Sequence, residues 1–474
     1  MKWTAAAALL CLVAAGCAAT DVAREVQSAV TELVATEALA GGRVGVVVLA
    51  AESGDTLAEH AGDRGFATAS NMKLLSSAVA LQTLGEQFTT TTDLVARGEV
   101  RDGVLLGDVV LRGHGDPTFG EGKAGDAALL AFVEALQQMG VKSIRGRVLG
   151  DGSWQGEETL GLGWQWDYLD EDYAAPFGGL CMAGNVVTVR VRPGTSGPEL
   201  RVLPVLEHFP TVAVTQGAAG SKTALVAHRV LGSDEIVVRG TIAADAKEQV
   251  LQVAVRDPAA FAAAAFLAVL RDRGIGVDGT SLEPAGPERV VASHTSPTLA
   301  AILRPLLTHS NNLYAEQVWR LAARVAVGDA STAAAERHAR SVLGGLGVDT
   351  AGMVLADGSG LSRRNLVQPR QIARLLAAMH ASPHREAFVA DLPVAGQTGT
   401  LRSRFAEGPA RGHVHAKTGY ISRVVCLSGF VHRKNESEPP LVFSVMLNDF
   451  TCEDALAKAA VDAFVQRLAR AAGW

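Results

Sequence analysis

The sequence predicts a mixed α/β (α+β) fold in which one domain, built from both ends of the chain, is interrupted by a large β-rich insertion. Near the start, residues 42–63 alternate between apolar and polar and lead into a helical pattern at 72–84. Residues 91–290 hold many short β-like runs separated by Gly, Pro and Ser, and helical patterns return after residue 295. At 474 residues the chain is too long for one ordinary core, which favours more than one domain.

Each element follows from its own pattern. The alternation in 42–63 predicts two strands joined by a turn at 52–55. The apolar spacing from Met72 onward predicts a helix that Gly85 ends. The remaining expected elements are a buried helix at 261–270, helices at 297–307 and 313–326, strands at 423–433 and 441–450, and a final helix at 453–472.

These elements predict an interrupted domain organisation. We expect a catalytic domain over 25–90 and 291–474, with the β-rich insertion at 91–290 forming two subdomains. Residues 1–18 carry one lysine, an apolar stretch and small residues around Cys17, which is the layout of a secretory signal. We therefore expect export to the periplasm or cell envelope. The Ala-Ala-Gly-Cys ending resembles a lipoprotein cleavage box, so membrane anchoring through a lipidated Cys17 stays open beside simple secretion.

Composition and charge exclude several classes of protein. Nearly half of the residues are apolar and 19% are charged, which is typical of a globular protein rather than a disordered one. The net charge of −6, without any block of like charges, predicts no nucleic-acid binding. His413 and His415 alternate along one strand-like run but lack a third ligand nearby, so we expect no metal.

Ser70 and Lys73 form the first motif with chemical content. Residues three apart are neighbours on a helix, and the start of a helix favours a developing negative charge. That arrangement suits a nucleophilic serine with a lysine as its base. Lysine at its ordinary pKa is a poor base, so burial or a second cation must lower that pKa. On its own, such a pair is weak evidence for catalysis, because Ser-x-x-Lys arises by chance in most chains.

Two further motifs make the combination specific. Ser310 and Asn312 supply Ser-x-Asn, and Lys417 begins Lys-Thr-Gly. Each of the three motifs occurs once, in the order that marks penicillin-binding proteins and β-lactamases. The contexts also fit, because the first motif opens a helix, the second precedes one and the third lies on a strand-like run.

The sequence resembles the low-molecular-mass class C penicillin-binding proteins, the D-alanyl-D-alanine carboxypeptidases/endopeptidases with a large insertion. Beyond the three motifs, the resemblance is carried by VVLRGHGDPTF (109–119), GWQWDYLDEDYAAP (163–176), DGSGLSRRNLVQP (357–369) and LPVAGQTGTL (392–401). It covers nearly everything after the signal. The resemblance implies a serine β-lactamase/transpeptidase-like catalytic domain that needs no cofactor.

The implied reaction is acyl transfer through a serine ester, with peptidoglycan stem peptides as substrates and β-lactams as covalent inhibitors. Ser70 is expected to attack the carbonyl between two D-alanines, and Lys73 to take its proton. Lys417 is the expected second cation, because a nearby like charge disfavours the protonated form of Lys73. By resemblance, Ser310 relays a proton to the leaving amine, and Asn312 holds Lys73 and the substrate amide.

The Lys-Thr-Gly strand is expected to bind the end of the substrate. Lys417 and the hydroxyl of Thr418 would attract a terminal carboxylate, and Gly419 completes the motif. By resemblance, the backbone N–H groups of Ser70 and Tyr420 form the oxyanion hole. Tyr420 stands where the family usually has a second threonine. This departure leaves the preference between carboxypeptidase and endopeptidase cleavage open.

Three more substrate contacts and two alternative functions complete the predictions. Leu361 and Arg363 are expected to grip the diamino-acid side chain, and Asp167 to contribute from the insertion. A β-lactamase would need a glutamate to activate water, and Glu157 and Glu158 fall in the insertion with nothing that places them near the serine. A catalytically dead wall-binding protein is the second alternative, although all three motifs are intact.

Overall fold

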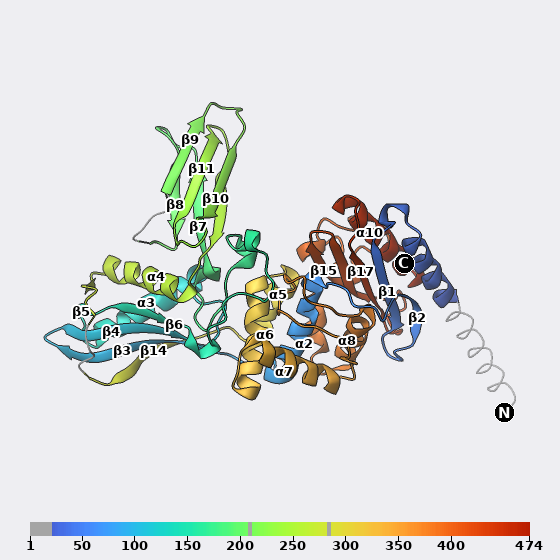
Figure 1. Ribbon diagram of the computed structural model, residues 1–474, viewed down its shortest axis with the longest axis horizontal. Helices are drawn as coiled ribbons and strands as arrows, with labels where there is room; N and C mark the ends of the chain where they lie inside the picture. Colours follow the sequence, from blue (N-terminus) through green and yellow to red (C-terminus); the bar gives the residue numbers. More distant parts are fainter. Residues whose placement is uncertain (1–20, 207–210, 282–285) are drawn as a thin grey trace. The chain divides into compact units, whose positions relative to one another are not determined.

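A computed structural model describes residues 21–206, 211–281 and 286–474 (Figure 1). The expected signal at 1–18, including Cys17, lies outside the described residues. The chain divides into two compact units. The first comprises Met1–Glu86, Leu303–Asn311 and Ala333–Trp474, and the second comprises Gln87–Ile302 and Asn312–Thr332. The expected boundaries of the insertion, at 91–290, stay a prediction.

The first unit contains a five-stranded antiparallel sheet in the order β15-β16-β17-β1-β2. Its middle joins the two ends of the chain, because Arg43 on β1 lies opposite Asn448 on β17. The strands are β1 (Arg43–Ala50), β2 (Thr56–His60), β15 (Val414–Ile421), β16 (Val424–Val431) and β17 (Leu441–Asn448).

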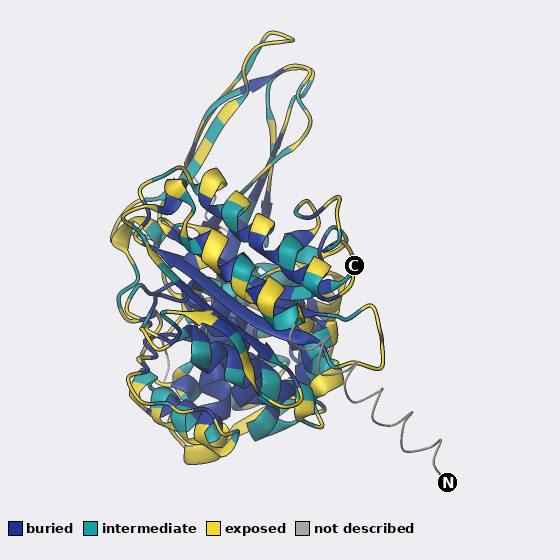
Figure 2. Cartoon of the chain, turned by 90° about the vertical axis from the view of Figure 1, so that its right-hand side faces the viewer, coloured by how far each residue is buried: buried dark blue, intermediate teal, exposed yellow. Residues whose placement is uncertain are grey.

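Helices bury both faces of the central strands. Every residue of β16 and β17 is buried, and Figure 2 shows strands of this kind in dark blue behind helices whose outer residues are exposed. One face packs in a common apolar core with α10 (Asp454–Ala471) and the helical residues 21–34. On the other side, α8 (Pro369–Ala381) packs against β1, β16 and β17. Strands covered on both faces become nearly continuous apolar runs, as the sequence of β17 shows.

Local signals in the sequence set where these helices begin and end. Gly85 ends α2 (Met72–Leu84) with a positive φ of 78°, which costs glycine little. Pro369 occupies the first position of α8, where its missing N–H is tolerated. The other helices of this unit are α7 (Thr332–Gly345), whose first residue belongs to the second unit, and α9 (Arg385–Ala390). Helix α5 (Leu299–Thr308) contributes residues to both units.

The second unit is rich in β structure. A six-stranded sheet in the order β13-β5-β4-β3-β14, with β6 paired to β4, shares an apolar core with α3 and α4. Two three-stranded sheets follow the orders β10-β11-β9 and β12-β7-β8. The elements are β3 (Thr91–Arg101), β4 (Val104–Gly113), α3 (Gly122–Gln138), β5 (Ser143–Arg145), β6 (Val148–Asp151), β7 (Val186–Arg192), β8 (Glu199–Leu203), β9 (Thr211–Gly217), β10 (Ala224–Arg229), β11 (Ile236–Ala243), β12 (Gln249–Ala254), α4 (Pro258–Asp272), β13 (Gly276–Val277), β14 (Glu288–Thr295) and α6 (Asn312–Val327).

Most of the expected elements are confirmed. The two early strands appear as β1 and β2, the buried helix at 261–270 lies within α4, and the final helix is α10. The sequence did not predict α3, because Gly122 and Gly125 weaken the helical signal at its start. Within the described ranges, every helix is too short or too polar to cross a bilayer.

Candidate active site

Ser70 lies in a short 3₁₀ turn, Ala69–Asn71, that leads directly into α2. The α-helix itself begins at Met72, so Ser70 precedes the first turn in which the sequence placed it. The backbone just before Ser70 is not helical, because Ala69 has a positive φ of 42°. A residue other than glycine in this region is strained, and such strain is typical of functional sites. The turn gives the serine a fixed place at the start of the helix.

Lys73 is fully buried one turn after the serine. Its Nζ donates to Oγ of Ser70 at 3.0 Å and to the backbone carbonyl of Ser359 at 2.6 Å. The predicted pairing of Ser70 with Lys73 therefore exists as a hydrogen bond. The carbonyl of Ser359 is a contact that the sequence could not reveal, because a backbone group has no residue signature.

A buried carboxylate shapes the loop that presents this carbonyl. Asp357 is fully buried and accepts hydrogen bonds from the N–H of Gly360 at 2.8 Å and of Ser362 at 2.6 Å. The side-chain amide of Asn365 donates to the same carboxylate at 2.6 Å. Charge-assisted hydrogen bonds of this kind are stronger than neutral ones. The shape of the turn around Ser359 thus comes from Asp357, in the stretch DGSGLSRRN.

Lys417 brings a second buried amine to the site from β15. Its Nζ donates to Oγ of Ser310 at 2.8 Å and to the carbonyl of Thr418 at 2.9 Å. Burial, together with the charge of Lys73, holds the pKa of Lys417 well below its ordinary value. Ser310 has a left-handed φ of 64°, a second strained position at this site.

The lowered pKa of Lys417 predicts a dependence of stability on pH. Between the lowered pKa of Lys417 and the ordinary pKa of lysine, the unfolded chain binds a proton that the folded chain has released. The free energy of unfolding should therefore rise with pH in the window between the lowered pKa and the ordinary one. The rise is at most about 1.4 kcal/mol per pH unit for one proton. Urea unfolding at pH 7, 8 and 9 should show this slope in the wild type relative to Lys417→Met.

A substitution at an exposed lysine provides the control. Lys434 is exposed, so Lys434→Met should keep the pH slope of the wild type. Parallel pH profiles for the wild type and Lys417→Met would contradict the lowered pKa.

The side chain of Asn71 connects the serine turn to the Lys-Thr-Gly strand and to its neighbour β16 through hydrogen bonds. Its side-chain amide donates to the carbonyl of Lys417 at 2.8 Å, and its amide oxygen accepts from Ser428 Oγ at 2.7 Å. Gly419 permits the close approach, since a Cβ there would lie 2.9 Å from the carbonyl oxygen of Thr68. This role of Asn71 was not predicted from the sequence. The signal was an asparagine at the start of an otherwise apolar helical run.

The next two positions of the strand have other partners. The hydroxyl of Thr418 donates to that of Thr400 at 2.8 Å, which gives a contact to the stretch LPVAGQTGTL. The Tyr420 side chain is half-exposed, and its hydroxyl donates to Asp454 on α10. Lys458 on the same helix places its Nζ 4.0 Å from the centre of the tyrosine ring. The tyrosine side chain is thus held by α10.

The remaining residues predicted to bind substrate are divided between the two units. Leu361 is buried in the first unit, and Arg363 donates to the carbonyl of Ser422. Asn312 is the first residue of α6 in the second unit, and its amide donates to the carbonyl of Tyr173 at 2.6 Å. Asp167 also belongs to the second unit, in the 3₁₀ turn Trp166–Tyr168.

Glu158, weighed as the water-activating group of a β-lactamase, has a structural role in the second unit. Its carboxylate accepts from Arg320 at 2.9 Å and from the hydroxyl of Thr332 at 2.6 Å. These contacts outweigh the opposing effect of burial and lower the pKa of Glu158. A carboxylate stabilised as an anion by an arginine is a weak base, so Glu158 lacks the properties of a general base.

The first unit therefore brings together a hydroxyl, its neighbouring buried amine, a second buried amine and a second hydroxyl: Ser70, Lys73, Lys417 and Ser310. Nucleophilic catalysis by serine requires such a hydroxyl within hydrogen-bond reach of a base. Within the described parts of the chain, no group of three or more His, Cys, Asp or Glu side chains is arranged to hold a metal.

Comparison with known sequences identifies the family. The sequence model of the D-Ala-D-Ala carboxypeptidase 3 (S13) family matches residues 26–471. The chain belongs to this family. The predicted resemblance is confirmed, and the protein is a serine-type DD-peptidase, a hydrolase.

Individual S13 relatives match over most of their length. The D-alanyl-D-alanine carboxypeptidase of Actinomadura sp. (strain R39) is 35% identical over 95% of this chain and 85% of its own. The crystal structure of penicillin-binding protein 4 from Haemophilus influenzae gives a TM-score of 0.75 at 24% identity, over 93% of this chain and 98% of that one. The same protein complexed with a β-lactam gives a TM-score of 0.72 at 25% identity, with the same coverage. The predicted fold class is confirmed.

Proposed function

We propose that this S13 enzyme cleaves peptide bonds after D-alanine in peptidoglycan stem peptides through an acyl ester on Ser70. The observation that carries the proposal is the hydrogen bond from the buried amine of Lys73 to Oγ of Ser70, 3.0 Å long. The family supplies the reaction, and this contact supports a nucleophile and base at defined residues.

In the proposed acylation, uncharged Lys73 takes the proton of Ser70 as Oγ bonds to the carbonyl carbon of the D-alanine. The oxyanion that forms would be held by the backbone N–H groups of Ser70 and Tyr420. When the C–N bond breaks, Ser310 passes a proton to the leaving amine and regains one from its hydrogen-bonded neighbour Lys417, which in turn receives the proton held by Lys73, so that Lys73 is uncharged again. Water then attacks the ester, Lys73 accepts its proton and gives it to Oγ of Ser70 as the ester C–O bond breaks, and the acid and free Ser70 are released.

The two lysines have complementary proposed roles. The mutual repulsion of two buried ammonium groups favours a site in which one amine is uncharged. The lowered pKa of Lys417 supports this arrangement, and a bound terminal carboxylate would return the proton to Lys417. Thr418 would bind the same carboxylate. Asn312 is proposed to hold the substrate amide.

The selectivity of the site is proposed to depend on three further side chains and on Tyr420. Asp454 and Lys458 hold the tyrosine side chain, and the backbone N–H of Tyr420 is the group proposed to bind the oxyanion. We propose that the enzyme accepts both terminal D-alanine and cross-links, since no threonine hydroxyl stands at position 420 to select a free carboxylate. The proposed contacts to the diamino-acid side chain are Leu361, Arg363 and Asp167.

The proposed place of action is the cell envelope, where peptidoglycan is found. The signal-like start supports export, and Cys17 supports a lipid anchor as the finer proposal. Acylation by β-lactams is proposed on the chemistry of the site. The β-lactam complex of the H. influenzae relative supports it.

Mass spectrometry of the protein mixed with a penicillin tests the proposal. We expect a persistent adduct of one drug molecule, located by peptide mapping on the peptide that contains Ser70. A stem pentapeptide should lose its terminal D-alanine, and a cross-linked dimer should be cut to monomers. An adduct on another serine, or none, would contradict the nucleophile. Rapid turnover of the drug would instead indicate a β-lactamase.

A further inference from the structure

The side chain that binds Thr418 in the structure has no part in the reaction proposed above. Thr400 lies in the 3₁₀ turn Gly399–Leu401, and its hydroxyl accepts a hydrogen bond from the hydroxyl of Thr418 at 2.8 Å. Both residues belong to the first unit, and both are half-buried. The hydroxyl expected to bind the substrate carboxylate is therefore oriented by a residue outside the Lys-Thr-Gly motif.

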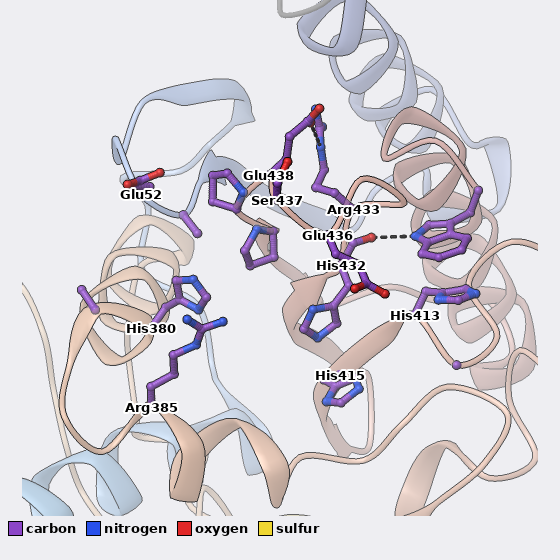
Figure 3. Close-up of a pocket in the computed structure, with 16 residues that line it drawn as sticks. Glu52, His380, Arg385, His413, His415, His432, Arg433, Glu436, Ser437 and Glu438 are labelled. Carbon is purple, nitrogen blue, oxygen red and sulfur yellow. Dashed lines mark hydrogen bonds and ion pairs between the residues drawn. The ribbon is translucent and has the colours of Figure 1, made fainter.

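Backbone hydrogen bonds attach the loop that leads to Thr400 to the strand that carries the motif. The N–H of Ala395 donates to the carbonyl of Val414 at 2.9 Å, and the N–H of Ala416 donates to the carbonyl of Pro393 at 3.0 Å. Val414 and Ala416 flank His415 on β15, a residue that lines a cavity of about 770 Å³ (Figure 3). The two threonine hydroxyls do not line this cavity, so their contact belongs to the motif end of the strand.

The turn that carries Thr400 also packs against the segment that leads to Ser310. A Cβ on Gly399 would lie 2.3 Å from the carbonyl oxygen of Thr308, so only glycine permits this approach. The hydroxyl of Thr308 in turn donates to the carbonyl of Asp391 at 2.7 Å. The turn is thus held between the segments of two motifs, which fixes the place of the Thr400 hydroxyl.

The number of protons limits what the two threonines can do. A hydroxyl has one proton to donate and two lone pairs that accept, and it rotates to suit its partners. In the structure Thr418 gives its proton to Thr400, so that proton is not available to a carboxylate. When both hydroxyls rotate, Thr400 donates to Thr418, and Thr418 donates to the carboxylate. The bond between the threonines is then kept, and hydrogen bonds in such a chain strengthen one another.

We propose that Thr400 is a positioning residue that turns the hydroxyl of Thr418 toward the terminal carboxylate of the substrate. This inference rests on the proposed function, which assigns that carboxylate to Lys417 and Thr418. Tyr420 replaces the second threonine of the family, and its hydroxyl is bound to Asp454, so the motif offers the carboxylate one threonine hydroxyl. Thr400 acts through that hydroxyl and does not itself touch the substrate.

Acylation by a penicillin and by its methyl ester tests the proposal, because only the free acid carries a carboxylate. Thr400→Val replaces the hydroxyl by a methyl group of similar size, so Thr418 loses its donor. We expect the second-order rate constant for the penicillin to fall about fivefold, as the loss of one neutral hydrogen bond implies. The fall should appear in the binding of the drug and not in the acylation rate at saturation. The methyl ester should acylate the variant and the wild type at equal rates.

Two more variants complete the test. Thr400→Ser keeps the hydroxyl and should restore the rate of the wild type. Thr56→Val changes an exposed threonine on β2, at the opposite edge of the sheet from β15, and should leave both rates unchanged. An equal fall with both drugs would indicate a structural effect and overturn the proposal, as would a Thr400→Val variant that reacts like the wild type. Failure of the proposed function would differ, because the wild type itself would form no adduct on Ser70.

Discussion

Replacing Lys73 by alanine should slow the acylation of Ser70 by a penicillin at least about 10³-fold, as the loss of a positioned general base implies. The amine of Lys73 is the group that the structure places on Oγ of Ser70, at 3.0 Å. Without it, the serine has to lose its proton to water. The rate of adduct formation can be measured by stopped flow, or by mass spectrometry of samples quenched at successive times. Ser70→Ala, which cannot form the adduct, gives the background signal.

A separate measurement distinguishes lost chemistry from lost structure. Lys73→Ala also leaves the buried carbonyl of Ser359 without this donor, which should cost about 1–3 kcal/mol of stability. Urea unfolding reports that cost independently of the rate. Lys434→Ala, at an exposed lysine, should change neither quantity. A variant Lys73→Ala that acylates within tenfold of the wild type would show that another group is the base.

Gly360→Ala should destabilise the protein by about 3 kcal/mol or more, since strain and overpacking act together. Gly360 has a positive φ of 85°, and a Cβ there would lie 1.8 Å from the carbonyl oxygen of Ala69. A backbone carbonyl cannot move away from the added Cβ as the end of a flexible side chain can. Because Ala69 directly precedes Ser70, any shift that relieves the clash also moves the nucleophile. The free energy of unfolding in urea and the acylation rate should therefore fall together.

Gly352→Ala separates the two causes. Gly352 has a similar φ of 69°, but the nearest atom to an added Cβ is Nε2 of Gln368 at 3.9 Å. This variant carries the left-handed strain alone, about 1 kcal/mol, and should acylate at the rate of the wild type. Equal losses of stability in the two variants would mean that the approach of Gly360 to Ala69 has no energetic consequence.

The contacts that the sequence predicted are those with a local or motif signature. The three-residue spacing of Ser70 and Lys73 predicted their contact, and the alternation at 42–63 predicted β1 and β2. The contact of Lys417 with Ser310 joins positions far apart in the chain, so only the family resemblance could suggest it. The sequence suggested that Lys417 shifts the pKa of Lys73. In the structure, the charge of Lys73 contributes to the lowered pKa of Lys417.

Other parts of the site could not be predicted, for physical reasons. The carbonyl of Ser359 reaches Lys73 through a loop whose shape depends on Asp357, and neither the loop nor its backbone contact follows a periodic pattern. The orientation of Tyr420 depends on α10, which lies more than thirty residues later. The roles of Asn312 and Asp167 stay predictions.

The pairing of β1 with β17 has a consequence for how the enzyme is made. Asn71 and Lys417, which hold the serine turn against its strand, are 346 residues apart in the chain. During synthesis, the residues around Ser70 emerge long before their partners, so β1 lacks one of its neighbours until nearly the whole protein has been translated. Contacts of such high sequence separation slow folding. The contacts that hold the serine turn in place can therefore form only after the chain has been made past Lys417.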